Sequence, residues 1–181
     1  MHPIDLLPRR RFITVTPLGS VFLIARGRYL EGCYFLSSRT FPEDMGIWAH
    51  PTDPVLEPAA LQIREYMAGT RQEFSIPLRA EGNDFCQRVW VRIAQIPYGA
   101  TATYGQLAAS LGNRHMARAV GQAVGMNPLS IVVPCHRVVA ANGGLGGYIA
   151  GPEVKRALLD LEACHRGTPE DVPVEGQDQL F

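Results

Sequence analysis

The sequence lacks the features that define several large classes of protein. It has no run of roughly 18 uninterrupted apolar residues, the length that a helix needs to cross a bilayer, so we expect no membrane protein. Its four cysteines are too few and too scattered for a disulfide scaffold, and no two lie at the short spacing of a zinc site. The apolar fraction of 46% with 19% charged residues is typical of a globular chain. We therefore expect a soluble protein of a reducing compartment, the cytoplasm, with no bound metal.

The chain as a whole has no excess of charge of either sign, because 17 basic residues balance 17 acidic ones. The two kinds of residue are, however, unevenly distributed along the chain. Residues 1–83 are neutral, residues 84–166 carry eight basic and four acidic side chains, and residues 167–181 carry four acidic ones and no basic one. A basic segment permits nucleic-acid binding, but solvated surface arginines would give the same count. Lys155 is the single lysine, so the preference for arginine can reflect genome composition instead of function.

The first half of the chain has the pattern of a small unit of strands and one helix. Apolar and β-branched runs flank the turn sequence Pro17-Leu18-Gly19, and a later segment has apolar residues at helical spacing. We find no catalytic constellation here. The predicted elements are strands at residues 12–16, 21–25 and 30–36, a loop over 37–54, a helix over 56–67, and a short strand or extended link at 74–78.

The composition changes at residues 79–84, a polar stretch that we take as the domain boundary. The predicted division is an N-terminal structural α/β domain over residues 1–82, a C-terminal domain over 83–166, and an acidic tail over 167–181 that can be disordered.

Capping signals predict three helices at the start of the second domain. Asn83 or Asp84 caps the first helix, which ends before Pro97. Thr103-x-x-Gln106 is a capping box that opens a second helix ending at Gly112, and a third helix follows over residues 116–126. The second and third helices resemble a helix-turn-helix, although a corner of a helical bundle would give the same pattern.

The third of these helices is unusually rich in alanine and glycine, including Ala119 and Gly121. Tight packing against another helix explains such a composition, and so does the close approach of a DNA backbone. A helix that reads the major groove normally carries several long polar side chains, whereas this one offers chiefly Arg118 and Gln122. If the helix binds DNA, we expect it to recognise shape or the minor groove.

The segment Pro134-Cys135-His136-Arg137 carries the candidate chemistry. Thiolate is the nucleophilic form of cysteine, and neighbouring basic groups favour it. A lone buried cysteine is usually inert, which is the interpretation for Cys33, Cys86 and Cys164. Neighbouring side chains of an extended strand point to opposite faces, so contact between Cys135 and His136 would require a turn or a water molecule.

At this point the sequence resembles the O6-alkylguanine-DNA alkyltransferases, the methylated-DNA–protein-cysteine methyltransferase family. Six further motifs occur in the family's order, and the looser N-terminal likeness extends the resemblance to nearly the whole chain. Beside Pro134-Cys135-His136-Arg137-Val138-Val139, they are Ile96-Pro97-Tyr98-Gly99, Thr103-Tyr104-Gly105-Gln106, Arg118-Ala119-Val120-Gly121, Asn127-Pro128, Gly146-Gly147-Tyr148 and Lys155-Arg156-Ala157-Leu158-Leu159-Asp160-Leu161-Glu162. The resemblance implies an α+β fold, with a β-rich N-terminal domain and a mainly helical C-terminal domain that carries a helix-turn-helix and the active-site cysteine.

The resemblance implies direct DNA repair by an irreversible, single-turnover transfer of an alkyl group from guanine O6 to Cys135, without a cofactor. His136 would act as the base through a bridging water, and Glu162 would hold its tautomer, as in a catalytic triad. Taken alone, Glu162 would be an exposed helix carboxylate. Asn127 would tie together the turns around the site, and the Tyr148 hydroxyl would donate toward the guanine.

The implied partner is double-stranded DNA that contains O6-alkylguanine, bound by a monomer, with cooperative binding left open. The target base would be flipped out through the minor groove. Arg118 would fill the gap in the stack, Tyr104 would crowd the neighbouring phosphate, and Ala119 and Gly121 would lie along the groove. We also predict that Arg137 contacts DNA.

The substrate pocket is expected at Tyr148, Ile149 and Val138. Relatives often have a polar residue in place of Ile149 and a glycine or a longer polar residue in place of Ala150, so the tolerated size of the alkyl group is open. The alternative function is a non-catalytic protein of the alkyltransferase-like type, which binds damaged DNA but replaces the nucleophile. The presence of Cys135 argues against it. A transcription regulator and a cysteine hydrolase fit less well, because the helix over residues 116–126 offers few side chains to read bases and water cannot resolve an S-alkyl cysteine.

Overall fold

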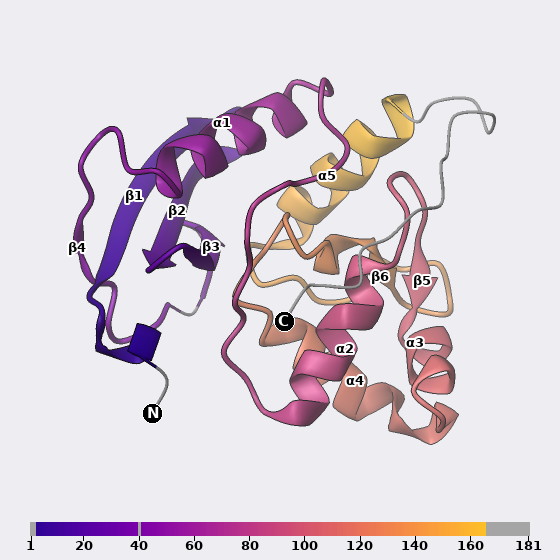
Figure 1. The fold of residues 1–181 in the computed structure, drawn as a ribbon. Coiled ribbons are helices and arrows are strands. Elements are labelled where there is room, and N and C mark those ends of the chain that lie inside the picture. Colours follow the sequence, from indigo (N-terminus) through magenta and orange to yellow (C-terminus); the bar gives the residue numbers. More distant parts are fainter. Residues whose placement is uncertain (1–2, 40, 166–181) are drawn as a thin grey trace.

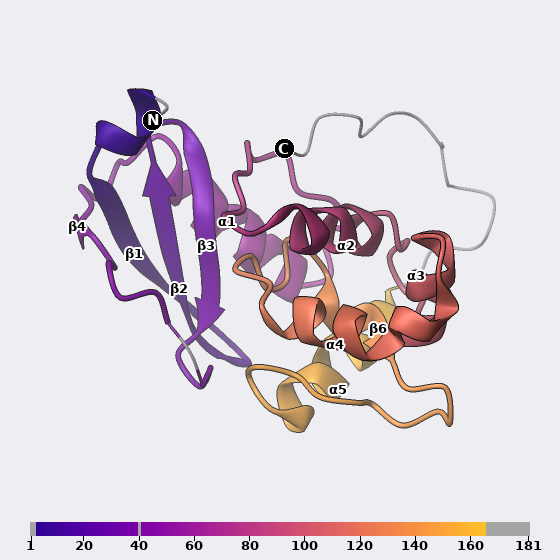
Figure 2. The same cartoon turned by 90° about the horizontal axis from the view of Figure 1, so that it is seen from below.

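The computed structural model describes residues 3–39 and 41–165, which form two parts lying side by side (Figures 1 and 2). The N-terminal part is a sheet with one helix on one face, and the C-terminal part is mainly helical. The predicted α+β class is confirmed. The predicted acidic tail lies outside the described residues. In chain order, the elements are η1 (Pro3–Leu6), β1 (Arg9–Thr16), β2 (Gly19–Arg26), β3 (Tyr29–Phe35), β4 (Ile47–Trp48), α1 (Leu56–Met67), α2 (Asp84–Ala94), β5 (Ala102–Thr103), α3 (Tyr104–Ser110), η2 (Arg114–Met116), α4 (Ala117–Gly125), η3 (Cys135–Arg137), β6 (Val138–Val139) and α5 (Pro152–Cys164).

The N-terminal sheet has the strand order β3-β2-β1-β4, and its first three strands form an antiparallel meander. Gly19, the last residue of the predicted turn, has φ +111°, a conformation that glycine adopts easily, and it begins β2. On β1 the side chains alternate, so that Thr14 and Thr16 are buried while Val15 is exposed. Helix α1 begins and ends as predicted, and its Ile63 is fully buried in the core.

One N-terminal detail differs from the sequence prediction, and a second decides between two alternatives that the prediction left open. The predicted loop over residues 37–54 contains the short strand β4, which pairs parallel to β1. The segment at residues 74–78 is an extended link, in which only Leu78 forms a bridge, to Leu30 of β3. Both features depend on contacts with distant strands, which local periodicity does not report.

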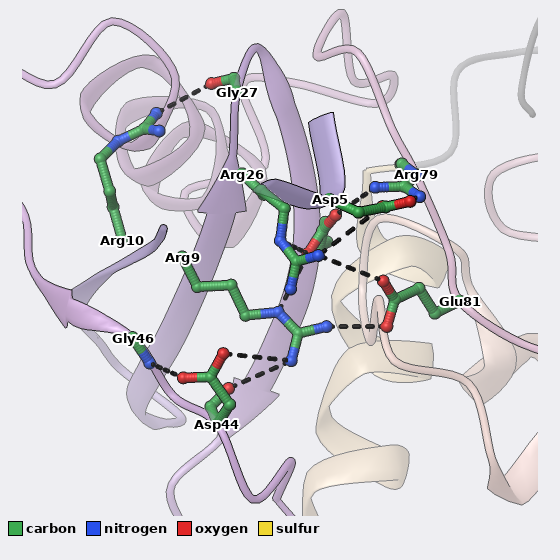
Figure 3. A network of polar contacts seen from close by, with 10 residues as sticks. Asp5, Arg9, Arg10, Arg26, Gly27, Asp44, Gly46, Arg79 and Glu81 are labelled. Carbon is green, nitrogen blue, oxygen red and sulfur yellow. Dashed lines mark hydrogen bonds and ion pairs between the residues drawn. The ribbon is translucent and has the colours of Figure 1, made fainter. Parts of the chain in front are cut away.

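A network of arginines and carboxylates fastens the segment between the two parts to the sheet (Figure 3). A register shift in the β2–β3 ladder places Glu31 at a bulge, where its side chain is only 3% exposed. Arg9, Arg26 and Arg79 contribute nitrogens 3.1, 3.4 and 3.1 Å from its carboxylate. Arg9 also contacts Glu81, 2.8 Å away, so the network reaches across the connecting segment.

Local capping explains where the C-terminal helices begin. The Asn83 side chain accepts the Cys86 N–H at the start of α2. Thr103 and Gln106 form the predicted capping box of α3. Helix α4 begins at Ala117 and packs on α2, where the indole N–H of Trp90 donates to a backbone carbonyl of α4.

The segment around the candidate cysteine is not the extended strand considered from the sequence. Cys135–Arg137 is a 3₁₀ turn (η3), followed by the two-residue strand β6. Just before it, Ile131 has φ +74°, a conformation that strains a β-branched residue. A turn at this place removes the geometrical objection to cooperation between neighbouring side chains.

The two parts meet along backbone hydrogen bonds close to that turn. The Cys33 N–H of β3 donates to the Pro128 carbonyl at 2.8 Å, and the Ser130 N–H donates to the Cys33 carbonyl at 2.9 Å. At the far end of α1, Gln72 donates to the His165 carbonyl beyond α5 at 3.0 Å. Within the described residues, no helix is long and apolar enough to span a membrane.

Candidate active site

Cys135 begins the turn η3 and is only 2% exposed. Burial raises the pKa of its thiol, while the side chains of Asn127 and Ser130 and the charge of Lys155 act in the opposite direction. The thiol therefore sits among groups that stabilise a thiolate, although the closed site disfavours that charge. The other cysteines differ in their surroundings. Cys33 and Cys86 are buried, but Cys164 is exposed, so the prediction that it is a buried, inert residue is wrong on burial.

His136 and Glu162 form a fully buried pair, with Nε2 of the imidazole 2.7 Å from Oε1 of the carboxylate. Desolvation lowers the pKa of His136, and the hydrogen bond and charge of Glu162 partly offset that effect. Nδ1 of His136 is buried and has no hydrogen-bond partner among the described residues. The carboxylate accordingly holds the proton on Nε2 and leaves Nδ1 free to accept one.

Glu162 is not the exposed helix carboxylate that its position alone would suggest. Burial disfavours its charge, but the hydrogen bond from His136 and the charges of His136 and Arg137 outweigh that effect and hold its pKa at about 2. Its Oε2 also accepts the Gly99 N–H at 2.8 Å, in the turn after α2. The carboxylate is therefore a fixed anion at neutral pH.

Arg137 does not have the position that we predicted for a DNA contact. It is 6% exposed, and its Nε lies 3.0 Å from both oxygens of Glu162. Its Nη1 donates to the Ile96 carbonyl at 2.5 Å. The guanidinium is thus occupied inside the protein, so the predicted contact between Arg137 and DNA is wrong for this structure.

Asn127 is 2% exposed and connects two turns beside the cysteine. Its Nδ2 donates to the Val133 carbonyl at 2.8 Å, and its Oδ1 accepts the Leu129 N–H at 3.0 Å. These bonds close the strained turn that leads to Cys135.

Lys155 is fully buried on α5 and was not among the predicted site residues. Its Nζ donates to the carbonyls of Val138, at 2.5 Å, and Gly147, at 3.3 Å. Burial lowers its pKa to about 8, against the opposing effect of Cys135. Lys155 therefore ties β6 to the loop before Tyr148, and it brings a cationic group close to the thiol.

Two of the predicted pocket residues, Val138 and Tyr148, have buried groups, and Tyr148 is close enough to Cys135 to feel its charge. Val138 is fully buried on β6, and the hydroxyl of Tyr148 is buried without a hydrogen-bond partner among the described residues. Burial raises the pKa of Tyr148 well above its usual value, so its hydroxyl stays protonated. The loop after β3 supports this segment, because the Arg39 N–H donates to the Ile149 carbonyl and the Ser37 hydroxyl donates to the Ala150 carbonyl, both at 3.3 Å.

The residues predicted to face DNA cluster on and beside α4. Arg118 is exposed on this helix, and Ala119 and Gly121 are partly exposed. The Tyr104 ring lies between the helix and the loop before Tyr148, since a Cβ at Gly121 would lie 3.7 Å from the ring and one at Gly146 would lie 2.8 Å from its hydroxyl. Glycine at both places lets α4 and the loop approach the tyrosine.

Tyr66, which the N-terminal helix α1 contributes to this site, was not predicted from the sequence. Its ring is fully buried, and its hydroxyl donates to Oε1 of Glu162 at 2.5 Å. We expected no catalytic constellation in the first half, and a tyrosine on an apolar helix face gives no sign of one. Lys155 had a signal, its place as the single lysine, which we attributed to genome composition.

The described residues contain no cluster of three His, Cys, Asp or Glu side chains that could hold a metal ion. The site brings together one thiol, one imidazole and the hydrogen-bonding groups that orient them. Such a set supports nucleophilic attack by sulfur with a histidine base.

Comparisons with known proteins identify the chain's relatives. A family model described as the DNA binding domain of 6-O-methylguanine DNA methyltransferase matches residues 84–164. The inducible methylated-DNA–protein-cysteine methyltransferase of Bacillus subtilis is 39% identical over 163 residues, which cover 90% of this chain and 88% of the relative. A Mycobacterium tuberculosis protein named methylated-DNA–protein-cysteine methyltransferase is 42% identical over 147 residues, covering 81% of this chain and 88% of the relative.

Solved structures agree with these relatives. The crystal structure of Mycobacterium tuberculosis O6-methylguanine methyltransferase matches with a TM-score of 0.79 at 38% identity, covering 90% of this chain and 96% of that one. A crystal structure of Mycobacterium tuberculosis OGT in complex with DNA matches with a TM-score of 0.77 at 39% identity, covering 87% and 93%. The chain belongs to the methylated-DNA–protein-cysteine methyltransferase family, as its motifs predicted.

Proposed function

We propose that this protein repairs DNA by transferring the alkyl group of O6-alkylguanine to its own Cys135, once per molecule. The observation that carries the proposal is that the buried Cys135 precedes, in the same 3₁₀ turn, the histidine of the buried His136–Glu162 pair, in a chain of this family. The relatives are named for this transfer, and one solved relative is in complex with DNA.

The transfer can be written with its atoms balanced. The thiol proton of Cys135 passes through a bridging water to Nδ1 of His136, the nitrogen that Glu162 leaves free. The thiolate attacks the alkyl carbon, an S–C bond forms as the C–O6 bond breaks, and the electron pair of that bond stays on O6. The leaving base takes up one proton from water and His136 returns its extra proton to water, so that a thiol and an alkylated guanine become a thioether and guanine.

The surrounding groups support this step in different ways. Glu162 stabilises the imidazolium that forms on His136, the role of the acid in a catalytic triad. The protonated Tyr148 hydroxyl donates toward the leaving base. Asn127 and Lys155 hold the turns on either side of the thiol. Water cannot displace the sulfur of a thioether, so the alkylated protein does not turn over.

We propose that the target base is flipped out of the duplex into this site, at a cost of a few kcal/mol in lost stacking and pairing. Arg118 is exposed on α4 and long enough to fill the gap in the stack, while Ala119 and Gly121 let the helix approach the minor groove. Tyr104 would press on the phosphate beside the target nucleotide. The DNA-binding and transfer residues then all belong to the proposed domain over residues 83–166.

The alkyl group would occupy the space bounded by Val138, Tyr148 and Ile149. Ile149 has no side-chain hydroxyl to offer, so a hydrogen bond to O6 from this position would have to come from its backbone N–H.

Intact-protein mass spectrometry tests the proposal. The protein is incubated with excess duplex containing O6-methylguanine, digested and mapped. We expect one added methyl group, on Cys135, that saturates at one equivalent, and no addition in Cys135→Ser, which should still bind the duplex. An unmodified wild-type protein that retains the duplex would instead indicate a damage-binding protein, and modification elsewhere would remove Cys135 from the reaction.

A further inference from the structure

The hydroxyl of Tyr66, a residue of the N-terminal part, contacts both members of the His136–Glu162 pair. It donates to Oε1 of Glu162 at 2.5 Å and lies 3.2 Å from Nε2 of His136. The same Oε1 accepts the imidazole N–H at 2.7 Å, so the phenol and the imidazole share one carboxylate oxygen. All three side chains are fully buried, and water does not compete for these bonds.

Two aromatic rings pack against the ring of Tyr66 and fix the direction of its hydroxyl. Its centroid lies 5.4 Å from the ring of Phe74 and 5.9 Å from the ring of Tyr98, nearly perpendicular to the latter. Phe74 belongs to the link after α1 and Tyr98 to the turn after α2. The hydroxyl is thus fixed by packing from both parts of the molecule.

We propose that Tyr66 is a positioning residue of the transfer reaction, whose hydroxyl occupies Oε1 of Glu162 and holds the His136 ring with Nε2–H toward the carboxylate and Nδ1 toward the thiol. This inference rests on the proposed function, since it assigns a role in the same reaction. Through Tyr66, the N-terminal domain contributes to catalysis as well as to stability.

The consequence concerns how strongly Glu162 stabilises a charged imidazole. A hydrogen bond from the phenol draws charge from Oε1, which weakens the attraction between the carboxylate and a proton on His136. Without that bond, the imidazolium would be more stable, and His136 would be neutral, and able to act as a base, only at higher pH. The charged and titratable groups facing His136 are Glu162 and Lys155 of α5, Arg137 of the same turn, Tyr66 of α1 and, on the proposed Nδ1 side, the thiol of Cys135.

The test compares two changes at Tyr66 that act in opposite directions. Tyr66→Phe removes the hydroxyl and keeps the ring, whereas 3,5-difluorotyrosine at position 66 keeps the hydroxyl and makes it a stronger donor. The rate of Cys135 methylation by duplex containing O6-methylguanine is measured in single turnover from about pH 5 to about pH 9. For Tyr66→Phe we expect an acidic limb moved up by about one pH unit and therefore a rate about tenfold lower at the acidic end. For difluorotyrosine we expect the limb to move down.

Tyr98→Phe is the matched control. Its hydroxyl is buried close by and has no hydrogen-bond partner among the described residues, so its removal changes the packing environment without removing a bond to the pair. We expect its pH profile to coincide with that of the wild-type protein. A lower unfolding temperature in Tyr66→Phe with an unmoved limb would assign Tyr66 a structural role only and overturn the proposal.

If Tyr66→Phe does not fold, the difluorotyrosine protein still tests whether the Tyr66 hydroxyl controls His136, because the difluorotyrosine side chain has nearly the shape of tyrosine. An acidic limb that stays in place with this substitution would also overturn the proposal. NMR titration of His136, labelled at Cε1, gives the same comparison without any reaction. If the wild-type protein takes up no methyl group, the proposed function fails, while an unmoved limb in a protein that does react contradicts only the role of Tyr66.

Discussion

Each half of the molecule buries one glutamate among cationic groups, and the two sites differ in the kind of partner they use. Glu31, on the N-terminal sheet, lies within 3.4 Å of the guanidinium nitrogens of Arg9, Arg26 and Arg79. These partners keep their charge at any physiological pH. Glu162, on the C-terminal helix α5, has one guanidinium, one imidazole, one phenol and a backbone N–H.

The difference separates a site that holds the fold from a site that takes part in a reaction. A carboxylate among permanent cations is satisfied once the chain has folded, and nothing in its surroundings changes afterwards. A carboxylate bonded to an imidazole responds when that imidazole gains a proton. Among the residues that the structure describes, only Glu162 is bonded to a histidine that adjoins a cysteine. The type of partner therefore distinguishes the two glutamates more clearly than burial does.

Replacing the reactive glutamate should have the largest effect. In Glu162→Gln the amide keeps the shape of the side chain but cannot stabilise the imidazolium, and its NH₂ group faces other donors. We expect the single-turnover rate of Cys135 methylation to fall by roughly 10² to 10³. Duplex binding by the folded variant, measured by fluorescence anisotropy, serves as the control and should be retained. A rate within about twofold of the wild type would exclude Glu162 from the catalytic pair.

Glu31→Gln is the matching change in the other half. It leaves three buried or half-buried guanidiniums without their common counter-charge, and breaking such a group typically costs about 3 kcal/mol. We expect urea unfolding to show a loss of that order, while the methylation rate of the folded protein stays unchanged. A proportional loss of rate would mean that the ionic network around Glu31 also controls the active site, and the division between the two glutamates would not hold.

The two halves also differ in how their arginines are engaged. Arg9 is engaged by carboxylates in the N-terminal half, whereas Arg118 makes no hydrogen bond or ion pair within the described residues. We expect Arg118→Ala to slow methylation by duplex about tenfold but to leave the reaction with free O6-methylguanine unchanged, because only the duplex requires base flipping. Arg92→Ala, which removes an exposed charge from α2, is the control. Equal losses on both substrates would contradict the role of Arg118 in flipping.

The elements predicted well from the sequence are those with local signals. Helix α1 follows its apolar spacing, and α3 follows the capping box of Thr103 and Gln106. The strand β4 was missed, because two residues that pair with a distant strand leave no local pattern. The turn at Cys135–Arg137 was also missed, since hydrogen bonds from Asn127 and a strained Ile131 shape it, and neither is visible as a period in the sequence.

The residues of the candidate site also separate into those that the sequence predicted and those that depend on tertiary contacts. Cys135 and His136 follow from their chemistry, and the resemblance to the family indicated Glu162 and Asn127. The prediction for Arg137 was wrong because its guanidinium is bonded to the buried carboxylate of Glu162. The sequence does not show that a charged residue in a motif has such a partner. Tyr66 lies 70 positions before His136, so only the tertiary arrangement of the chain brings its hydroxyl to the site.

Lys155, the single lysine of the chain, is buried near the thiol. We expect its titration to have a small effect on the stability of the folded protein. Burial lowers its pKa from the usual 10.5 to about 8. The unfolded chain therefore binds more protons than the folded one between those values, and the stability contributed by this group rises with pH across that window. Below about pH 8, the lysine is charged in both states and the full penalty of burying the charge remains.

The measurement is the difference in urea-unfolding free energy between the wild-type protein and Lys155→Met, followed from about pH 7 to about pH 10. Methionine has a similar length and does not titrate, so groups common to both proteins, including the buried tyrosines, cancel in the difference. We expect the wild type to gain on the order of 1 kcal/mol relative to the variant as the pH rises. The arginine network around Glu31 should contribute nothing to this slope, because guanidinium groups do not lose their protons in this range. A flat difference would mean that Lys155 stays charged in the folded protein up to pH 10, and its two carbonyl acceptors would then be sufficient to hold an ammonium ion in the core.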